Sequence, residues 1–253
     1  MLENTTKTKL LAGETVLGCF IKHSEPAFAE FVAMQGWDFL VFDAEHGTLQ
    51  PRDVEGLCRA AELREVTPIA RVTTNQPHII LRFLDTGIHG VHVPWVNTAA
   101  AVEQAVQSVK YQPRGRRGLA GSRASDWGMY ESIGEYTKRA NRETIVVIHI
   151  ETMDAVNAID DYVGIDGVDV LFIGPTDLSH SLGHPGDPAH PEVAAAMDRV
   201  ADAVVDSDKA LGIYAGSPAT AEQWLDRGAR YLATGVDGFI EQGMQAYLSR
   251  LRN

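Results

Sequence analysis

The stretch GVDVLFIGPTDLS, at residues 167–179, contains the pattern that decides the fold. Its run at residues 168–173 is largely apolar without strict alternation, which is typical of a strand buried on both faces. Gly174 and Pro175 end the run, and a helix is expected at residues 191–206. The stretch therefore indicates a strand followed by a helix, the unit from which α/β proteins are built.

The same unit recurs along the whole chain. The expected strands lie at residues 15–21, 39–43, 67–72, 87–94, 144–150, 168–173, 210–214 and 231–234, and the helices that follow them at residues 26–35, 51–63, 77–84, 98–111, 153–159, 191–206, 218–227 and 237–251. Eight units in 253 residues predict an α/β fold with a single (β/α)8 TIM barrel, one domain over residues 1–253. A doubly wound open sheet is the alternative, but no GxGxxG motif follows the first expected strand.

Composition and charge exclude several classes of protein. The formal net charge of −12 would repel phosphate backbones, so we expect no nucleic-acid partner. Cys19 and Cys58 lie far apart without zinc-ligand spacing, which excludes a disulfide-built scaffold and fits a reducing compartment. The first residues lack the apolar core of a signal peptide, and runs such as 144–150 are far shorter than the ~20 residues of a membrane span. We therefore expect a cytoplasmic protein without membrane attachment.

Residues 112–143 interrupt the alternation of strands and helices. The beginning of this segment is rich in Gly, Arg and Ser, and a long irregular insertion is often a lid or a contact surface. A surface excursion with one helix near residues 133–142 explains it equally well. Its arginines either bind a phosphate or a second carboxylate or form salt bridges between subunits: Arg114, Arg116, Arg117 and Arg123.

Polar side chains follow several expected strands at their carboxyl ends, where the catalytic groups of a barrel gather. Asp43 and His46 follow the second strand, Arg71 ends the third, and Glu151 and Asp177 follow the fifth and sixth. Each has a structural explanation when taken alone, such as a rim salt bridge for Arg71 or a turn for Asp177. Together, at successive strand ends, they favour a functional site.

These residue types indicate carbonyl chemistry assisted by a metal. Glu151 and Asp177 supply hard oxygen ligands that suit a divalent cation such as Mg²⁺ or Mn²⁺. Arg71 offers a planar donor fork for a carboxylate, and His46 has the pKa range to move a proton near neutral pH. We expect Asp43 to orient the His46 imidazole.

Imine chemistry is the alternative, and it requires a lysine inside the barrel mouth. The chain has six lysines, and only Lys22, directly after the first expected strand, is placed to reach the mouth. A single lysine at the rim is more often solvated. The sequence therefore favours metal-assisted chemistry over a Schiff base.

Several of these motifs together resemble the HpcH/HpaI aldolase family, the metal-dependent class II pyruvate aldolases. The resemblance covers residues 12–250 and is specific because the motifs occur together. They are WDFLVFDAEH (37–46), IARV ending near Arg71, YQPRGRRG (111–118), IHIET (148–152) and GVDVLFIGPTDLS (167–179).

The resemblance implies a role for each matching residue. Glu151 and Asp177 would bind the divalent cation (Mg²⁺, Mn²⁺ or Co²⁺), Arg71 the pyruvyl carboxylate and enolate oxygen, and His46, assisted by Asp43, would act as acid and base. The pocket wall would come from Gly174, Pro175 and Thr176. It also implies a last helix exchanged between subunits, in a homo-oligomer that is a hexamer built as a trimer of dimers. One position departs from the family, which usually has Gln where this chain has His149.

The expected activity is reversible cleavage of a 2-keto-3-deoxy or 4-hydroxy-2-keto acid to pyruvate and an aldehyde. Three alternatives stay open at this point: a CoA-ester lyase, a citrate-type condensing enzyme, and a non-catalytic barrel that binds a keto acid. Metal-dependent release of pyruvate distinguishes the aldolase from all three.

Overall fold

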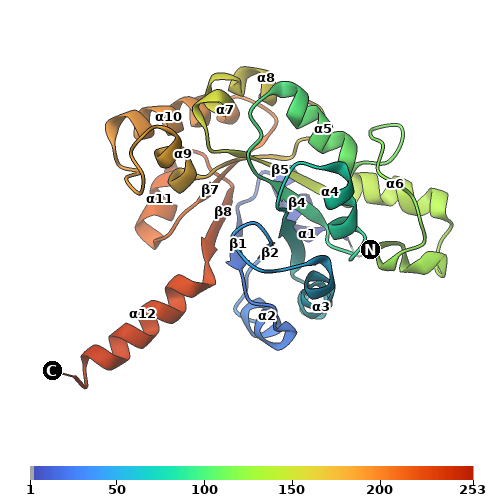
Figure 1. Cartoon of the computed structure of the whole chain (residues 1–253), viewed down its shortest axis with the longest axis horizontal. Coiled ribbons are helices and arrows are strands. Elements are labelled where there is room, and N and C mark those ends of the chain that lie inside the picture. The colour runs from blue at the N-terminus through green and yellow to red at the C-terminus, as the bar shows by residue number, and fades with distance from the viewer. Residues whose placement is uncertain (1–2, 253) are drawn as a thin grey trace.

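The computed structural model describes residues 3–252, and the strands in that range form one closed barrel (Figure 1). The strands are β1 (Val16–Ile21), β2 (Phe39–Asp43), β3 (Thr67–Arg71), β4 (Gly90–Val93), β5 (Ile145–Ile150), β6 (Val170–Ile173), β7 (Ala210–Tyr214) and β8 (Tyr231–Gly235). Each pairs in parallel with its neighbours in sequence, and β8 pairs with β1 to close the ring. The predicted (β/α)8 barrel is confirmed.

Helices surround the barrel on its outer side (Figure 1). They include α2 (Pro26–Ala33), α3 (Pro51–Glu62), α4 (Pro77–Leu84), α5 (Ala99–Val109), α10 (Pro191–Val205) and α11 (Pro218–Asp226). Most of them begin with proline, whose fixed φ and missing N–H suit the first position of a helix. No helix within residues 3–252 is long and apolar enough to cross a membrane.

Two separate apolar clusters show why the strands lack alternation. Phe39 and Val41 of β2 belong to a cluster that fills the barrel interior, whereas Leu40 and Phe42 belong to the layer between the strands and the helices. Side chains of a strand alternate between the two faces, and both faces are buried here. Every second residue of a strand therefore points into the barrel. On β2 these residues are Phe39 and Val41, and the next in the repeat is Asp43.

The structure differs from the sequence expectation in three places. The N-terminal residues, which carried no predicted element, form α1 (Thr5–Leu11), and Leu10 enters the interior cluster. Residues 175–181, expected to be a loop, form α9 (Pro175–Ser181), because Pro175 occupies a first helical position. The helix predicted at 153–159 consists of two short helices, α7 (Met153–Asn157) and α8 (Ile159–Val163).

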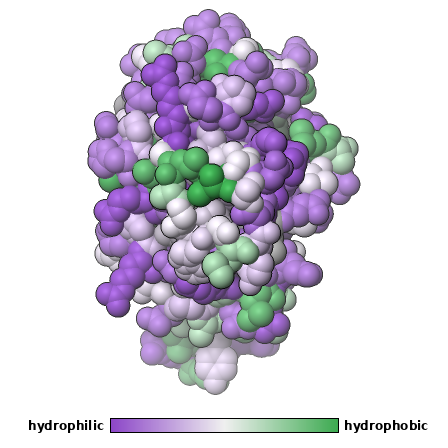
Figure 2. All heavy atoms as spheres, turned by 90° about the vertical axis from the view of Figure 1, so that its right-hand side faces the viewer, coloured by the Kyte–Doolittle hydropathy of each residue, from purple (hydrophilic) through white to green (hydrophobic). Residues whose placement is uncertain are grey.

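The segment at 112–143 lies on the outside of the molecule. It contains a 3-10 turn, η1 (Arg123–Gly128), and α6 (Ile133–Glu143), which confirms the helix expected near residues 133–142. Arg117 pairs with Asp85 and Arg123 with Glu62, so these two arginines form ion pairs within the chain. The face of the molecule that carries α6 is mostly hydrophilic, with small separate apolar groups (Figure 2).

Gly90 provides a test of the close strand packing. A Cβ atom at this position would lie 2.5 Å from the carbonyl oxygen of Ile145 on β5, which is fixed in the sheet. We expect Gly90→Ala to lower the free energy of unfolding by about 1–3 kcal/mol in urea denaturation, the usual cost of overpacking. Gly134→Ala is the control, because its Cβ in α6 meets no atom within 4 Å, and we expect it to be neutral or stabilising by up to about 1 kcal/mol. Equal stability of the two variants would contradict the register of β4 and β5.

Candidate active site

A cavity of about 390 Å³ opens where the strands end, and every residue predicted for the site lines it. These residues are Asp43, His46, Arg71, Glu151, Gly174, Pro175, Thr176 and Asp177. Lys22 lines the same cavity, as expected for a residue directly after β1. Among the described residues, none of 112–143 lines it, so the structure does not support that segment as a lid within one chain.

Arg71 and Asp43 form a buried ion pair at the ends of β3 and β2. The two residues are register partners, and Arg71 Nε and Nη2 donate to the two oxygens of Asp43 at 2.8 and 2.6 Å. Burial alone would raise the pKa of Asp43, but the hydrogen bond and charge of Arg71 hold this pKa below its usual value. The guanidinium also lies over the Phe20 ring, 5.0 Å from its centroid. This geometry fixes the plane of the guanidinium.

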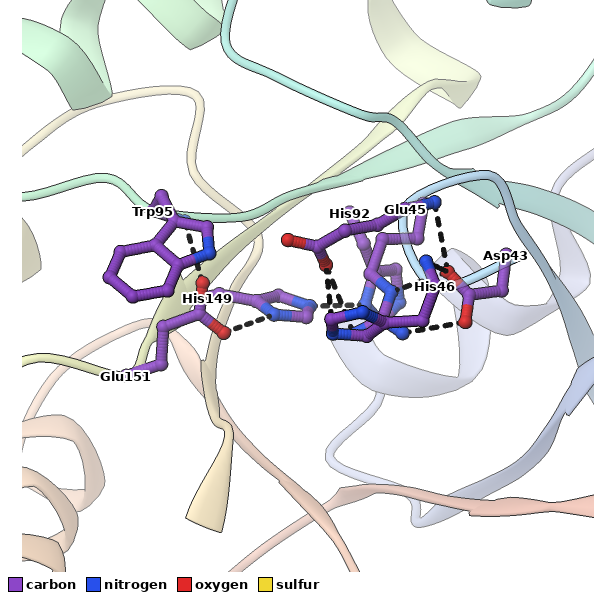
Figure 3. A network of polar contacts seen from close by, with 8 residues as sticks. Asp43, Glu45, His46, His92, Trp95, His149 and Glu151 are labelled. Carbon is purple, nitrogen blue, oxygen red and sulfur yellow. Dashed lines mark hydrogen bonds and ion pairs between the residues drawn. The ribbon is translucent and has the colours of Figure 1, made fainter. Parts of the chain in front are cut away.

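The contacts of Asp43 differ from the expected orientation of the His46 ring. Oδ1 of Asp43 also accepts the backbone N–H groups of Glu45 and His46, at 3.1 and 3.2 Å. The His46 ring is half exposed, and its Nε2 lies 3.9 Å from Oε2 of Glu45 (Figure 3). Asp43 therefore holds the loop after β2 through its backbone, and its carboxylate is directed to Arg71 rather than to the imidazole.

Glu45 is a site residue that the sequence reasoning did not select. Its Oε2 lies 3.2 Å from Nη1 of Arg71, and it has no hydrogen-bond partner among the described residues. Burial raises the pKa of Glu45 to about 7, with Arg71 opposing the shift and the carboxylates of Glu151, Asp43 and Asp177 adding to it. The DAEH motif contained Glu45, but only the fold shows that it turns inward beside Arg71.

Glu151 is buried and held through both of its oxygens. Oε1 accepts the backbone N–H of Trp95 at 2.6 Å, and Oε2 lies 3.1 Å from Nδ1 of His149 (Figure 3). Trp95 has a φ of 53°, a left-handed conformation unusual for a bulky residue. Burial would raise the pKa of Glu151, but His149, the Trp95 N–H and Arg71 lower it. Gly174 leaves room for the carboxylate, since a Cβ there would come within 3.1 Å of Oε2.

Asp177 lies in the first turn of α9 and faces the same cavity as Glu151. Its carboxylate has no hydrogen-bond or ion-pair partner within residues 3–252. Glu151 and Asp177 thus provide a set of hard oxygen donors on the wall of one cavity. The carboxylate of Glu151 is held in place, and that of Asp177 has no partner among the described residues. This set fits a divalent cation that keeps positions open for other oxygen ligands.

Two further residues extend the site into the barrel. His92 of β4 and Tyr231 of β8 lie beneath His149, where His92 Nδ1 is 2.9 Å from His149 Nε2 and His92 Nε2 is 2.7 Å from the Tyr231 hydroxyl. Burial, with His149 and Arg71 nearby, lowers the pKa of His92. The sequence reasoning placed His92 in a strand without assigning it a role. The two-residue repeat of inward positions along the strand is the signal that could have identified it.

Comparisons with known proteins identify the family of the chain. The sequence profile of the HpcH/HpaI aldolase/citrate lyase family matches residues 16–241. The chain is 34% identical over 236 residues to a hydroxypyruvate/pyruvate aldolase of Cupriavidus necator, covering 92% of this chain and 87% of that protein. It is also 34% identical over 237 residues to a 5-keto-4-deoxy-D-glucarate aldolase of Shigella boydii, covering 92% of this chain and 90% of that protein.

The fold is similar to that of a solved HpcH/HpaI aldolase/citrate lyase family protein from Burkholderia cenocepacia. The TM-score is 0.93 at 32% sequence identity, and the match covers 99% of this chain and 100% of the other. The profile match covers most of the chain, and the relatives align over nearly all of it. The chain therefore belongs to the HpcH/HpaI aldolase/citrate lyase family and is a carbon–carbon lyase of the aldolase type.

Proposed function

We propose that the chain is a divalent-metal-dependent aldolase that reversibly cleaves a 2-keto-3-deoxy or 4-hydroxy-2-keto acid to pyruvate and an aldehyde. The observation that carries this proposal is the placement of Glu151, Asp177 and Arg71 around one cavity. The two carboxylates provide for a metal ion, and the guanidinium provides for the carboxylate of a keto acid. The two aldolases that resemble the chain along most of its length support the same reaction class.

Glu151 and Asp177 would hold the cation, Mg²⁺, Mn²⁺ or Co²⁺. When bound, such an ion polarises a 2-keto oxygen and stabilises the negative charge of an enolate. The fixed carboxylate of Glu151 and the partner-free carboxylate of Asp177 supply the ligands, and Gly174, Pro175 and Thr176 form the adjoining wall of the pyruvate pocket.

Arg71 would bind the substrate carboxylate and stabilise the enolate oxygen. Nε and Nη2 of Arg71 donate to Asp43. The N–H groups of Nη1 point away from Asp43, toward Glu45. Asp43 acts here as a positioning residue, because it fixes the guanidinium before substrate arrives. Preorganised donors aimed at a developing negative charge contribute strongly to catalysis in a site that excludes water.

His46 would act as the acid and base, from its half-exposed place at the cavity mouth. In the cleavage direction His46 takes the proton of the C4 hydroxyl, directly or through one water. The C3–C4 bond then breaks, its electron pair forms the enolate of pyruvate, and the C4 carbon leaves as the aldehyde. Protonation of the enolate at C3 yields pyruvate, and the reverse steps form the bond.

We also propose that α12 (Val236–Ser249) packs against another subunit of a homo-oligomer. This helix projects away from the barrel (Figure 1), and in it only Val236 is buried. Met244 and Tyr247 are 60% and 68% exposed, and with Ile240 they follow the i, i+4, i+7 spacing of an apolar helix face. A second chain would cover this face, as in the helix exchange that the family resemblance implies.

Metal dependence is the direct test of the proposed reaction. We expect the chelator-treated protein to release pyruvate from 2-keto-3-deoxy sugar acids only after Mg²⁺, Mn²⁺ or Co²⁺ is restored. Glu151→Gln and Asp177→Asn should each reduce this release at least about 100-fold, more than the loss of a residue that only supports a ligand. Glu135→Gln, on the exposed side of α6, is the control.

Two other results would contradict the proposal. Full turnover in the presence of chelator, with a pyruvate adduct trapped on Lys22 by borohydride, would establish imine chemistry. Tight metal binding without pyruvate from any acid would favour a CoA-ester lyase or a condensing enzyme.

Glu45 should make the stability of the metal-free protein depend on pH. Its pKa is about 7 in the folded chain against an ordinary value of 4.5, so the folded state binds more protons between these two values. The free energy of unfolding therefore falls as pH rises through this window. We expect Glu45→Gln to become progressively more stable relative to the parent between pH 5 and pH 8 in urea unfolding. Glu103→Gln, on the exposed face of α5, is the control. A difference in stability between Glu45→Gln and the parent that stays constant with pH would refute the expectation.

Substitutions that place a charge on the apolar face of α12 test the proposed homo-oligomer. Met244→Asp or Tyr247→Asp should lower the mass measured by light scattering, because a buried unpaired carboxylate disfavours the interface. Gln245→Asp adds the same charge on the neighbouring surface of α12 and should leave the mass unchanged. If Met244→Asp and Tyr247→Asp leave the mass unchanged too, this helix face is not an interface.

A further inference from the structure

Three buried side chains, one on the cavity wall and two beneath it, take no part in the steps described so far. Tyr231, His92 and His149 come from β8, β4 and β5, and each is at most 1% exposed. They form a continuous hydrogen-bonded chain that ends at Glu151, with donor–acceptor distances of 2.7, 2.9 and 3.1 Å. Figure 3 shows the part of this chain that runs from His92 through His149 to Glu151.

With both imidazoles neutral, the chain has one consistent direction of hydrogen bonding, which the carboxylate of Glu151 sets. An ionised carboxylate only accepts hydrogen bonds, so Nδ1 of His149 carries the proton that faces Glu151. In a neutral imidazole Nε2 of His149 is then an acceptor, and it receives the proton on Nδ1 of His92. Nε2 of His92 in turn accepts from the Tyr231 hydroxyl. Each proton thus points toward Glu151, and the Tyr231 hydroxyl at the far end supports the same tautomers by donating to Nε2 of His92.

Aromatic packing holds the members of the chain in place. The His92 ring meets Phe172 and Phe20 edge-on, with centroids 5.1 and 5.5 Å away. Tyr231 stacks on Phe39 at 4.2 Å. A ring that rotated would break its hydrogen bonds without finding others in this apolar interior. No polar atom of His92, His149 or Tyr231 is left without a partner among the described residues.

We propose that the Tyr231–His92–His149 chain is a positioning device for Glu151. It fixes the tautomer of His149, whose Nδ1–H holds Oε2, while the Trp95 N–H holds Oε1. Apolar side chains would fill the same space without the cost of burying polar groups. A buried polar network that ends at a carboxylate therefore indicates a function at that carboxylate. The orientation of Glu151, and with it the affinity for a divalent cation, then depends on a hydroxyl on β8. This inference rests on the proposed role of Glu151 as a metal ligand.

Tyr231→Phe tests the chain by removing one hydroxyl and keeping the stacked ring. The matched control is Tyr162→Phe, which removes a buried hydroxyl that donates to the Val96 carbonyl at 3.0 Å, outside the chain. Mn²⁺ binding to the metal-free full-length protein is measured by calorimetry, alongside the melting temperature. We expect Tyr231→Phe to weaken Mn²⁺ binding roughly 10- to 100-fold, the usual effect of losing a residue that supports a metal ligand. Tyr162→Phe should lose a similar amount of stability and keep the affinity.

Substitutions at His149 test the same idea by rescue. Glutamine donates with its NH₂ group and accepts with its carbonyl, so His149→Gln should keep most of the Mn²⁺ affinity. His149→Leu keeps the apolar volume and should lose affinity to the extent that Tyr231→Phe does. All titrations use a His184→Ala background, because the ligand atoms of His184, His190 and Glu192 lie within 4.8 Å of one another at the surface and would bind a metal separately.

The outcomes separate this inference from the proposed function. Equal Mn²⁺ affinity in Tyr231→Phe and Tyr162→Phe, or in His149→Gln and His149→Leu, would overturn the positioning role while leaving the metal site intact. A protein that binds no Mn²⁺, or that binds it equally after Glu151→Gln, would overturn the metal site and the positioning role together.

Discussion

The two-residue repeat of a parallel strand buried on both faces is the constraint on which the rest of this structure depends. Along β2, Phe39 and Val41 fill the barrel interior, and the next inward position is Asp43. The same continuation places Arg71 on β3 and His149 on β5 at the edge of the cavity. The apolar interior of the barrel and the polar groups at the carboxyl ends of its strands thus follow from the same two-residue repeat.

Burial then decides how these charges are arranged. Asp43 and Arg71 neutralise each other through two hydrogen bonds, which leaves the carboxylates of Glu151 and Asp177 on the cavity wall and that of Glu45 beside Arg71. Burial, opposed by Arg71 and reinforced by the neighbouring carboxylates, raises the pKa of Glu45 to about 7. A divalent cation held by Glu151 and Asp177 would relieve this excess of negative charge, which connects the electrostatics of the barrel mouth to the proposed chemistry.

The sequence was sufficient for the barrel and for the members of the site, because strand ends of a barrel meet at one rim. The sequence was insufficient to predict which of several possible hydrogen-bond partners a polar side chain contacts. Asp43 was expected to orient His46, yet it pairs with Arg71, which lies opposite it in the sheet register. His92 and Tyr231 are 139 residues apart, and only the closed barrel brings them together. The backbone N–H of Trp95 reaches Glu151 through a left-handed conformation that no local motif indicates.

The most direct test of the central claim is anomalous diffraction from crystals of the protein grown with Mn²⁺ and pyruvate. The account predicts a manganese peak contacting the carboxylates of Glu151 and Asp177, with pyruvate bound to the ion and its carboxylate beside Arg71. A manganese peak only at the surface group of His184, His190 and Glu192, with pyruvate away from Arg71, would contradict it.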